Sequence, residues 1–336
     1  MRVFRLLIAV FALGALSACS TTGVDALSVR TPAPLPSEKY ASIVVDGNTG
    51  RTIYQVDAGA PRYPASLTKM MTLYMLYEAL SAGRVSMATE IPVSRHAATR
   101  PPSKLGLKAG STVDVRTAIN ALSVKSANDV AAAVGEYLGG DEERFAAMMT
   151  AKARSIGMTG TVFRNASGLP DDAQRTTARD MALLGLALQK RFPQYFGNFS
   201  QRSFAYRGRT IKGHNRLIGS VEGVDGIKTG YIRASGFNVV TSVGRRGKRL
   251  IVVVMGGKTA RERDAHVTEL IERFLPSGNR RPAAVNTGVM VQPAALPPLD
   301  DDDLPGVSAA APDVPLDVPP AGAVPVEVGD GVIVAQ

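Results

Sequence analysis

The 336-residue chain has one cysteine, no tryptophan and three histidines. Because Cys19 is the only cysteine, the chain cannot form an internal disulfide, and the rest of the sequence has no thiol for a nucleophile or a zinc ligand. His96, His214 and His266 are scattered without the helical spacing of metal ligands. We therefore expect neither a metal site nor a cofactor, and a fold that rests on its hydrophobic core.

The first residues have the pattern of an export signal. Arg2 and Arg5 precede an apolar run over residues 6–16, which is too short to cross a bilayer comfortably. The run ends in Leu16-Ser-Ala-Cys19, where Leu16 occupies a position that an ordinary cleavage site reserves for a small residue. This predicts a lipoprotein-type signal peptide over residues 1–18 and a lipid anchor on Cys19, with an ordinary signal peptide as the alternative. We expect an exported protein on the periplasmic side of a bacterial membrane.

Composition divides the rest of the chain. Residues 19–37 are polar with alternating prolines and are predicted to be a tether. Residues 278–336 are rich in Pro, Ala and Asp and are predicted to be a disordered tail. One catalytic domain is expected between them, over residues 38–277.

Charge is distributed unevenly. Residues 282–336 hold eight acidic residues and no lysine or arginine; since the whole chain carries +10, the remainder carries about +18. Such basicity favours anionic partners. The export signal argues against nucleic acid, and anionic wall polymer or membrane lipid is the expected partner.

Strand patterns occur at both ends of the predicted domain, with helical patterns between them. Strands are expected at 41–46, 51–55, 204–212, 226–231, 237–243 and 250–255. Helices are expected at 66–80, from a Ser111-x-x-Asp114 capping box to 124, from an Asn128 cap to 139, at 141–156, from Thr177, and at 260–274. This order predicts an α/β (α+β) domain with one mostly antiparallel sheet built from both ends, flanked by helices and carrying an inserted helical subdomain.

Three short motifs follow one another in order: Ser66-Leu-Thr-Lys69, Ser126-Ala-Asn128 and Lys228-Thr-Gly230. Each is weak alone, since an S-x-x-K match is expected about once by chance in a chain of this length. Their order and contexts, at a helix start, in a loop between helices and on a strand, make the combination specific.

The first motif has the chemistry of a nucleophile and its base. A serine hydroxyl needs a base within hydrogen-bond reach, and a helix starting at Ser66 places Lys69 on the same face one turn later. Burial and the positive end of the helix both disfavour the ammonium form and lower the pKa of this lysine.

The other two motifs suit a relay and a substrate site. Ser126 could relay a proton and the Asn128 amide could hold the substrate backbone, although a turn serine and a plain helix cap are the alternatives. Lys228 and Thr229 offer a cation and a hydroxyl to a carboxylate, and Gly230 allows close approach of another backbone. We expect the backbone N–H groups of Ser66 and Tyr231 to bind an oxyanion.

These motifs resemble those of the penicillin-recognising serine enzymes, and most closely the serine-type D-alanyl-D-alanine carboxypeptidases, which are low-molecular-mass penicillin-binding proteins. Five stretches within about 40–275 carry the resemblance: 64–70, 125–129, Asn165-Ala-Ser-Gly-Leu169, His214-Asn-Arg-Leu217 and 225–231. It implies a DD-peptidase/β-lactamase-like fold, Ser66 as the acyl-enzyme nucleophile, Lys69 as general base and Ser126 as proton relay. It also implies that Asn128 holds substrate and that Lys228, Thr229 and an arginine meet the terminal carboxylate; Arg263 aligns best and Arg261 is the alternative.

The resemblance implies a penicillin-sensitive carboxypeptidase that removes the terminal D-Ala from peptidoglycan stem peptides ending in D-Ala-D-Ala, with β-lactams as covalent inhibitors. Many family members carry a β-rich second domain and an amphipathic anchor, which the tail and the Cys19 lipid replace here. A D,D-endopeptidase that cleaves cross-links therefore stays open.

Two further alternatives belong to other classes. A class A-like β-lactamase needs a glutamate-activated water, but no E-x-x-L-N segment lies between the second and third motifs, and Asp171 and Asp172 are the only nearby acids. The second alternative is a non-catalytic lipoprotein that binds wall polymer or senses penicillin. A Ser-His-Asp hydrolase has no support, because the G-x-S-x-G elbow is missing.

Overall fold

A computed structural model of the chain describes residue 35 and residues 37–278. The predicted signal peptide with Cys19, the tail beyond residue 278 and all of the predicted tether except residues 35 and 37 lie outside this description. Among the described residues, no helix is both long and apolar enough to cross a membrane.

The main sheet has five antiparallel strands in the order β2-β1-β9-β8-β7. The strands are β1 (Ala41–Asp46), β2 (Thr52–Val56), β7 (Val224–Ile232), β8 (Gly236–Arg245) and β9 (Lys248–Gly257). The first two come from one end of the domain and the other three from the opposite end, and β1 pairs with β9 along its whole length. This confirms the predicted sheet built from both ends. β9 is buried on both faces, which explains its unbroken apolar sequence.

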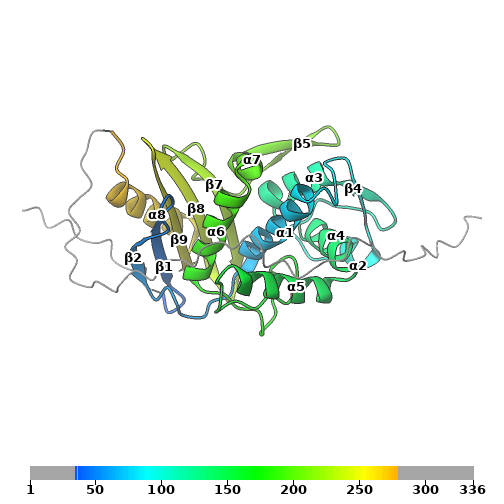
Figure 1. Cartoon of the computed structure of the whole chain (residues 1–336), viewed down its shortest axis with the longest axis horizontal. Helices are drawn as coiled ribbons and strands as arrows, with labels where there is room; N and C mark the ends of the chain where they lie inside the picture. Colours follow the sequence, from blue (N-terminus) through cyan, green and yellow to red (C-terminus); the bar gives the residue numbers. More distant parts are fainter. Residues whose placement is uncertain (1–34, 36, 279–336) are drawn as a thin grey trace, which may run out of the picture.

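Helices cover both faces of the sheet (Figure 1). One face packs under α8 (Ala260–Phe274), where Val267 and Ile271 join a core cluster with Val252 and Val254. The other face packs against α6 (Ala178–Arg191), which joins the larger core shared with the helical region. β7 is left as an edge strand beside the start of that region.

The inserted helical subdomain surrounds one buried helix, α1 (Lys69–Ser81). Around it lie α2 (Arg95–Ala98), α3 (Val115–Asn120), the π-helical turn η2 (Ala121–Lys125), α4 (Asn128–Gly139) and α5 (Glu142–Ser155). Residues Met70 to Leu76 of α1 are buried all round its circumference, as its mostly apolar sequence requires.

Two predicted helix starts differ in detail. Ser111 does not cap a helix, because residues 112–114 form strand β4, which pairs with β3 (Glu90–Pro92); Asp114 caps α3 instead by accepting from Thr117 N. Asn128 does not cap α4 either: the cap position is Ala127, and the Asn128 side chain is used elsewhere. The helices predicted to start at residue 141 and at Thr177 are confirmed as α5 and α6, and Asp141 and Thr177 cap them.

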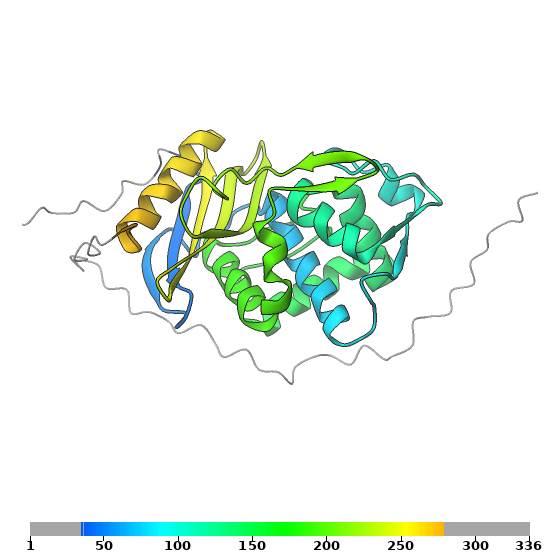
Figure 2. The same ribbon diagram turned by 90° about the horizontal axis from the view of Figure 1, so that it is seen from above.

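The predicted strand region around Gly208 is a separate hairpin of β5 (Ser203–Tyr206) and β6 (Arg209–Lys212). It projects from the sheet across the helical subdomain, as the view from above shows (Figure 2). Before it come α7 (Pro193–Phe196) and the 3-10 turn η3 (Gly197–Ser200), which the sequence reading missed along with β3, β4 and α2.

Candidate active site

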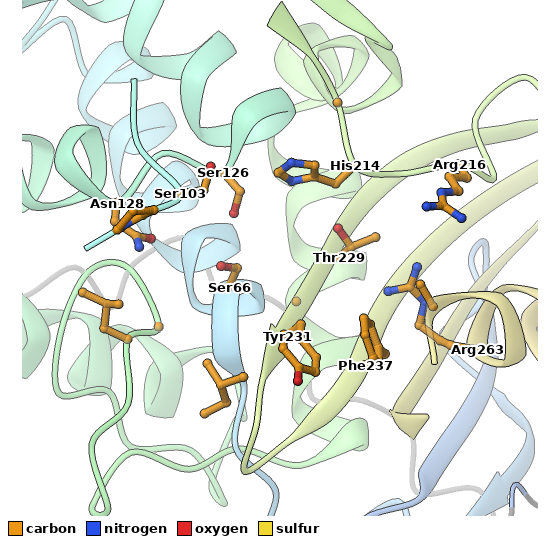
Figure 3. A pocket seen from close by; sticks show the side chains of 17 residues that line it. Ser66, Ser103, Ser126, Asn128, His214, Arg216, Thr229, Tyr231, Phe237 and Arg263 are labelled. Atoms are coloured by element: carbon orange, nitrogen blue, oxygen red, sulfur yellow. The ribbon is translucent and has the colours of Figure 1, made fainter. Parts of the chain in front are cut away.

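A cleft of about 430 Å³ lies between edge strand β7 and the helical subdomain (Figure 3). Its walls contain residues of all three motifs, namely Ser66, Ser126, Asn128, Thr229 and Gly230. Lys69 and Lys228 lie behind these walls, since both are almost completely buried. Motifs separated by about 60 and 100 residues therefore meet at one site.

Ser66 lies on a tight 3-10 turn, η1 (Ala65–Thr68), which leads directly into α1. The expected helix thus begins with a 3-10 turn rather than a regular α-helical one. Gly230 packs against this turn so closely that a Cβ there would lie 3.1 Å from Ser66 N and 3.2 Å from Leu67 N. The third motif needs glycine at this position because two backbones approach each other here.

Lys69 has three polar contacts around a fully buried amine. Its Nζ lies 3.2 Å from Ser66 Oγ, 2.7 Å from Asn128 Oδ1 and 2.6 Å from the Ser167 carbonyl oxygen. Burial, and after it the charge of Lys228, hold the pKa of Lys69 well below its usual range. The lysine is therefore placed and tuned to contact Ser66 as a neutral amine.

The loop over residues 165–169 supplies the Ser167 carbonyl that contacts the Lys69 amine. Thr72 Oγ1 donates to Ala166 O at 2.6 Å, which ties the loop to α1. Gly168 has φ +83°, and a side chain there would collide with the Ala65 carbonyl. The sequence reading noted this stretch only as part of the resemblance and did not find that the Ser167 carbonyl binds the lysine.

The second motif lies where η2 ends. Ser126 adopts a left-handed conformation with φ 60°, and its buried Oγ has no hydrogen-bond partner within residues 37–278. Asn128 accepts from Lys69 through Oδ1 and donates through Nδ2 to Pro101 O at 2.8 Å. Its amide thus positions the lysine as well as facing the cleft.

Lys228 is only 2% exposed on β7, and its Nζ donates to Thr229 O at 2.9 Å. Burial, with a further contribution from Arg263, lowers its pKa to about 7. None of the ion pairs within the described residues involves this lysine. Lys228 is therefore a buried amine that has no carboxylate partner among the described residues.

Two arginines line the end of the cleft beyond Thr229, as Figure 3 shows. Arg263, from α8, is 3% exposed and donates to Asn238 O at 3.0 Å and to Asp264 Oδ1 at 2.6 Å. Burial lowers its pKa. Arg261, the alternative from the sequence, is exposed and does not line the cleft.

Arg216 and His214 are cleft residues that the sequence reading did not assign. Both belong to the His214–Leu217 stretch, so the resemblance was the only available signal. Tyr231, 54% exposed, stacks on Phe237 at 4.2 Å between ring centroids and forms the opposite rim. No aspartate or glutamate lines the cleft, and within the described residues no group of three or more His, Cys, Asp or Glu could hold a metal.

The chain matches the family model described as D-alanyl-D-alanine carboxypeptidase over residues 29–259. The chain belongs to this family. It is similar to the D-alanyl-D-alanine carboxypeptidase DacA of Escherichia coli, with 33% identity over 75% of this chain and 65% of that protein. It is 31% identical to DacF of Bacillus subtilis, over 71% of this chain and 62% of the relative. The matches thus span slightly less than two thirds of these relatives.

Solved structures of penicillin-binding proteins are similar in fold. Penicillin-binding protein 5 of Haemophilus influenzae is similar with a TM-score of 0.69 and 29% identity, over 72% of each chain. Penicillin-binding protein D2 of Listeria monocytogenes in its cefotaxime-bound form is similar with a TM-score of 0.65 and 29% identity, over 72% of this chain and 98% of that one. The DD-peptidase-like α/β fold implied by the resemblance is therefore confirmed.

Proposed function

We propose that the protein is a penicillin-sensitive serine D,D-carboxypeptidase that removes the terminal D-Ala from peptidoglycan stem peptides. The observation that carries this proposal is the layout of the cleft. Ser66, with Lys69 buried behind it, lines one part, and Thr229, Arg216 and Arg263 line the adjoining part. A nucleophile next to a cationic carboxylate site suits cleavage one residue from a free chain end.

The contacts of Lys69 explain how it would act as the general base. A neutral amine has two N–H groups and one lone pair. The Asn128 amide oxygen and the Ser167 carbonyl can only accept, so they take the two N–H groups. The lone pair is then left for Ser66 O–H, which transfers its proton to Nζ as Oγ attacks the substrate carbonyl.

The tetrahedral oxyanion would form between the start of η1 and strand β7. Backbone N–H groups of Ser66 and Tyr231 are the proposed donors there. Breakdown expels the D-Ala amine, which receives a proton through Ser126, and leaves an ester on Ser66. A water molecule then hydrolyses this ester, releasing the shortened peptide and regenerating the serine.

The substrate's terminal carboxylate would be held by the Thr229 hydroxyl, Arg263 and the buried charge of Lys228, while the Asn128 amide and Gly230 accommodate its backbone. A guanidinium binds a carboxylate through two parallel hydrogen bonds, which fixes the orientation of the chain end. This holding would set the penultimate carbonyl at Ser66.

A D,D-endopeptidase is the second candidate, since both reactions use the same acyl-enzyme chemistry. A β-lactamase is less well supported, because no carboxylate lines the cleft to activate a water on the acyl-enzyme. Asp171 accepts from Ala173 N in its own turn, and neither it nor Asp172 lines the cleft. A long-lived penicillin ester is also expected, because the opened β-lactam ring stays attached to the acyl group and cannot leave as D-Ala does; the β-lactam complexes of the Listeria relative support β-lactam binding.

We further propose that the protein acts outside the cytoplasmic membrane and is attached through a lipid on Cys19. The exported location of the peptidoglycan substrate and the sequence pattern at residues 1–19 support this proposal.

The decisive experiment combines active-site labelling with turnover. Mass spectrometry should find penicillin bound to Ser66, and the Ser66→Ala variant should not be labelled. The parent should release D-Ala from a soluble peptide ending in D-Ala-D-Ala and hydrolyse penicillin slowly. Cleavage of cross-linked dimers alone would favour the endopeptidase. Fast penicillin turnover without D-Ala release would favour the β-lactamase. A protein that acts on none of these three substrates would be a binding protein.

A further inference from the structure

The β5–β6 hairpin lies in a stretch of the chain that carries charge of one sign only. Between Asp180 and Glu222 the chain contains seven lysines and arginines and no aspartate or glutamate. Four of the seven lie at the base, tip and second strand of the hairpin and are exposed: Arg202, Arg207, Arg209 and Lys212. None of the ion pairs found in residues 37–278 involves any of these four. The hairpin is therefore an uncompensated cationic surface.

This surface is held rigidly beside the cleft. Phe204 is buried in the helical core, and Tyr206 and Ile211 pack against the same core from the hairpin. At the base, Gly213 N donates to Arg202 O at 2.8 Å, and a Cβ on Gly213 would lie 3.3 Å from Val124 of η2. One face of the hairpin is thus fixed on the subdomain, which leaves its cationic residues to face solvent.

The hairpin also runs directly into the cleft wall. β6 ends at Lys212, and the next two residues, Gly213 and His214, line the cleft together with Arg216. Partial burial lowers the pKa of His214, and the nearby charges of Lys228, Lys125 and Lys69 lower it further. Positive charge therefore continues from the hairpin tip into the site where substrate is proposed to react.

We propose that the β5–β6 hairpin is a docking surface for the carboxylate-bearing wall polymer that carries the substrate peptides. This inference rests on the proposed function and extends it from the chain end to the polymer around it. A small peptide fills the cleft, whereas a polymer must continue past its rim, and the hairpin is attached to that rim. Cationic residues distributed along its length can pair with successive carboxylates and raise the local concentration of polymer.

The test uses two full-length variants with equal charge changes. The hairpin variant carries Arg207→Gln, Arg209→Gln and Lys212→Gln. The control carries Arg51→Gln, Lys190→Gln and Lys248→Gln, which are exposed residues that do not line the cleft. Neither variant changes a residue of the proposed catalytic or carboxylate-binding set, so both should hydrolyse a soluble D-Ala-D-Ala peptide as the parent does.

On purified, lipid-free peptidoglycan at low ionic strength, we expect D-Ala release by the hairpin variant to fall about tenfold, in the range typical of lost electrostatic steering. Co-sedimentation with this material should fall in parallel. The control variant should match the parent in both assays. High salt should bring the parent down to the level of the hairpin variant, because exposed charges are screened.

Several outcomes would overturn the proposal. Equal losses in both variants would mean that only net charge matters, and unchanged binding of the hairpin variant would leave the surface without this role. Loss of binding to anionic phospholipid vesicles but not to peptidoglycan would make it a membrane contact. Faster turnover of the soluble peptide by the hairpin variant would mean that the acidic residues 300–303 occupy the hairpin in cis. A parent that releases no D-Ala from the soluble peptide would instead contradict the proposed function.

Discussion

Lys69 Nζ lies 3.2 Å from Ser66 Oγ, while Asn128 Oδ1 and Ser167 O hold the same nitrogen at 2.7 and 2.6 Å. The two shorter contacts come from acceptors that can never donate, on two different segments of the chain. The amine is therefore oriented by the helical subdomain and the 165–169 loop together, with one position left for the serine.

Replacing Lys69 with arginine should abolish the base, because it puts a permanent cation where the neutral amine is needed. A guanidinium does not deprotonate in proteins, so the rate of penicillin acylation should fall by at least about two to four orders of magnitude, the usual contribution of a general base. Stopped-flow acylation kinetics measure this. Thermal unfolding serves as the control, since arginine must fit a fully buried site, and near-parental acylation would place the base elsewhere.

The pH profile of kcat/KM should be bell-shaped for a substrate with a free carboxylate. Lys69 must be neutral, so the rate should rise with pH through its lowered pKa. Lys228 must be charged, and its pKa is lowered to about 7, so binding should weaken as pH rises above that value. A substrate with an amidated end should lack the alkaline decline. A decline of equal size for both substrates would show that Lys228 does not bind the carboxylate.

Gly168→Ala should impair both stability and acylation. The new methyl group would collide with the Ala65 carbonyl of the nucleophile turn, in addition to the cost of about 1–2 kcal/mol for a side chain at positive φ. Gly208→Ala is the matched control, because Gly208 has φ +73° with nothing within 4 Å of a new Cβ. Differential scanning calorimetry and acylation rates should separate the two, and similar behaviour would mean that the loop does not support the turn.

Arg263→Lys should raise KM for a peptide with a free carboxylate about tenfold or more and change KM for its amide little. Lysine keeps the charge but loses the paired N–H donors that match a carboxylate. Arg261→Lys, at the neighbouring exposed position, should behave as the parent. If the arginine instead serves only to anchor Asn238 and Asp264, both substrates will lose activity equally.

Cys19→Ser should change where the protein resides. If Cys19 carries the lipid, the variant should either remain unprocessed or leave the membrane fraction, since a soluble domain is released when its acyl anchor is lost. Fractionation with immunodetection, together with mass spectrometry of the mature N-terminus, measures this. Membrane fractionation identical to that of the parent would indicate an ordinary signal peptide or a different anchor.

The sequence by itself determined the family and the fold class, and it predicted which groups react. Ser66 and Lys69 are three residues apart, and helix geometry alone brings such a pair together. The sequence also predicted the strands at 41–46 and 250–255 and the buried helix after Ser66. In these segments the local hydrophobic pattern matches the final structure.

Only the tertiary structure decided how these groups are oriented and which others join them. The carbonyl of Ser167 binds Lys69, yet a backbone carbonyl carries no sequence signature. The sequence predicts that Asn128 caps a helix, but its side chain accepts a hydrogen bond from Lys69 instead. A tertiary contact across 59 residues here overrides the local capping preference. Arg216 and Arg263 come to lie at one end of the cleft only when the sheet and the subdomain pack together. The same packing lowers the pKa values of Lys69 and Lys228, because it buries both amines and places Lys228 near Lys69 and Arg263 near Lys228.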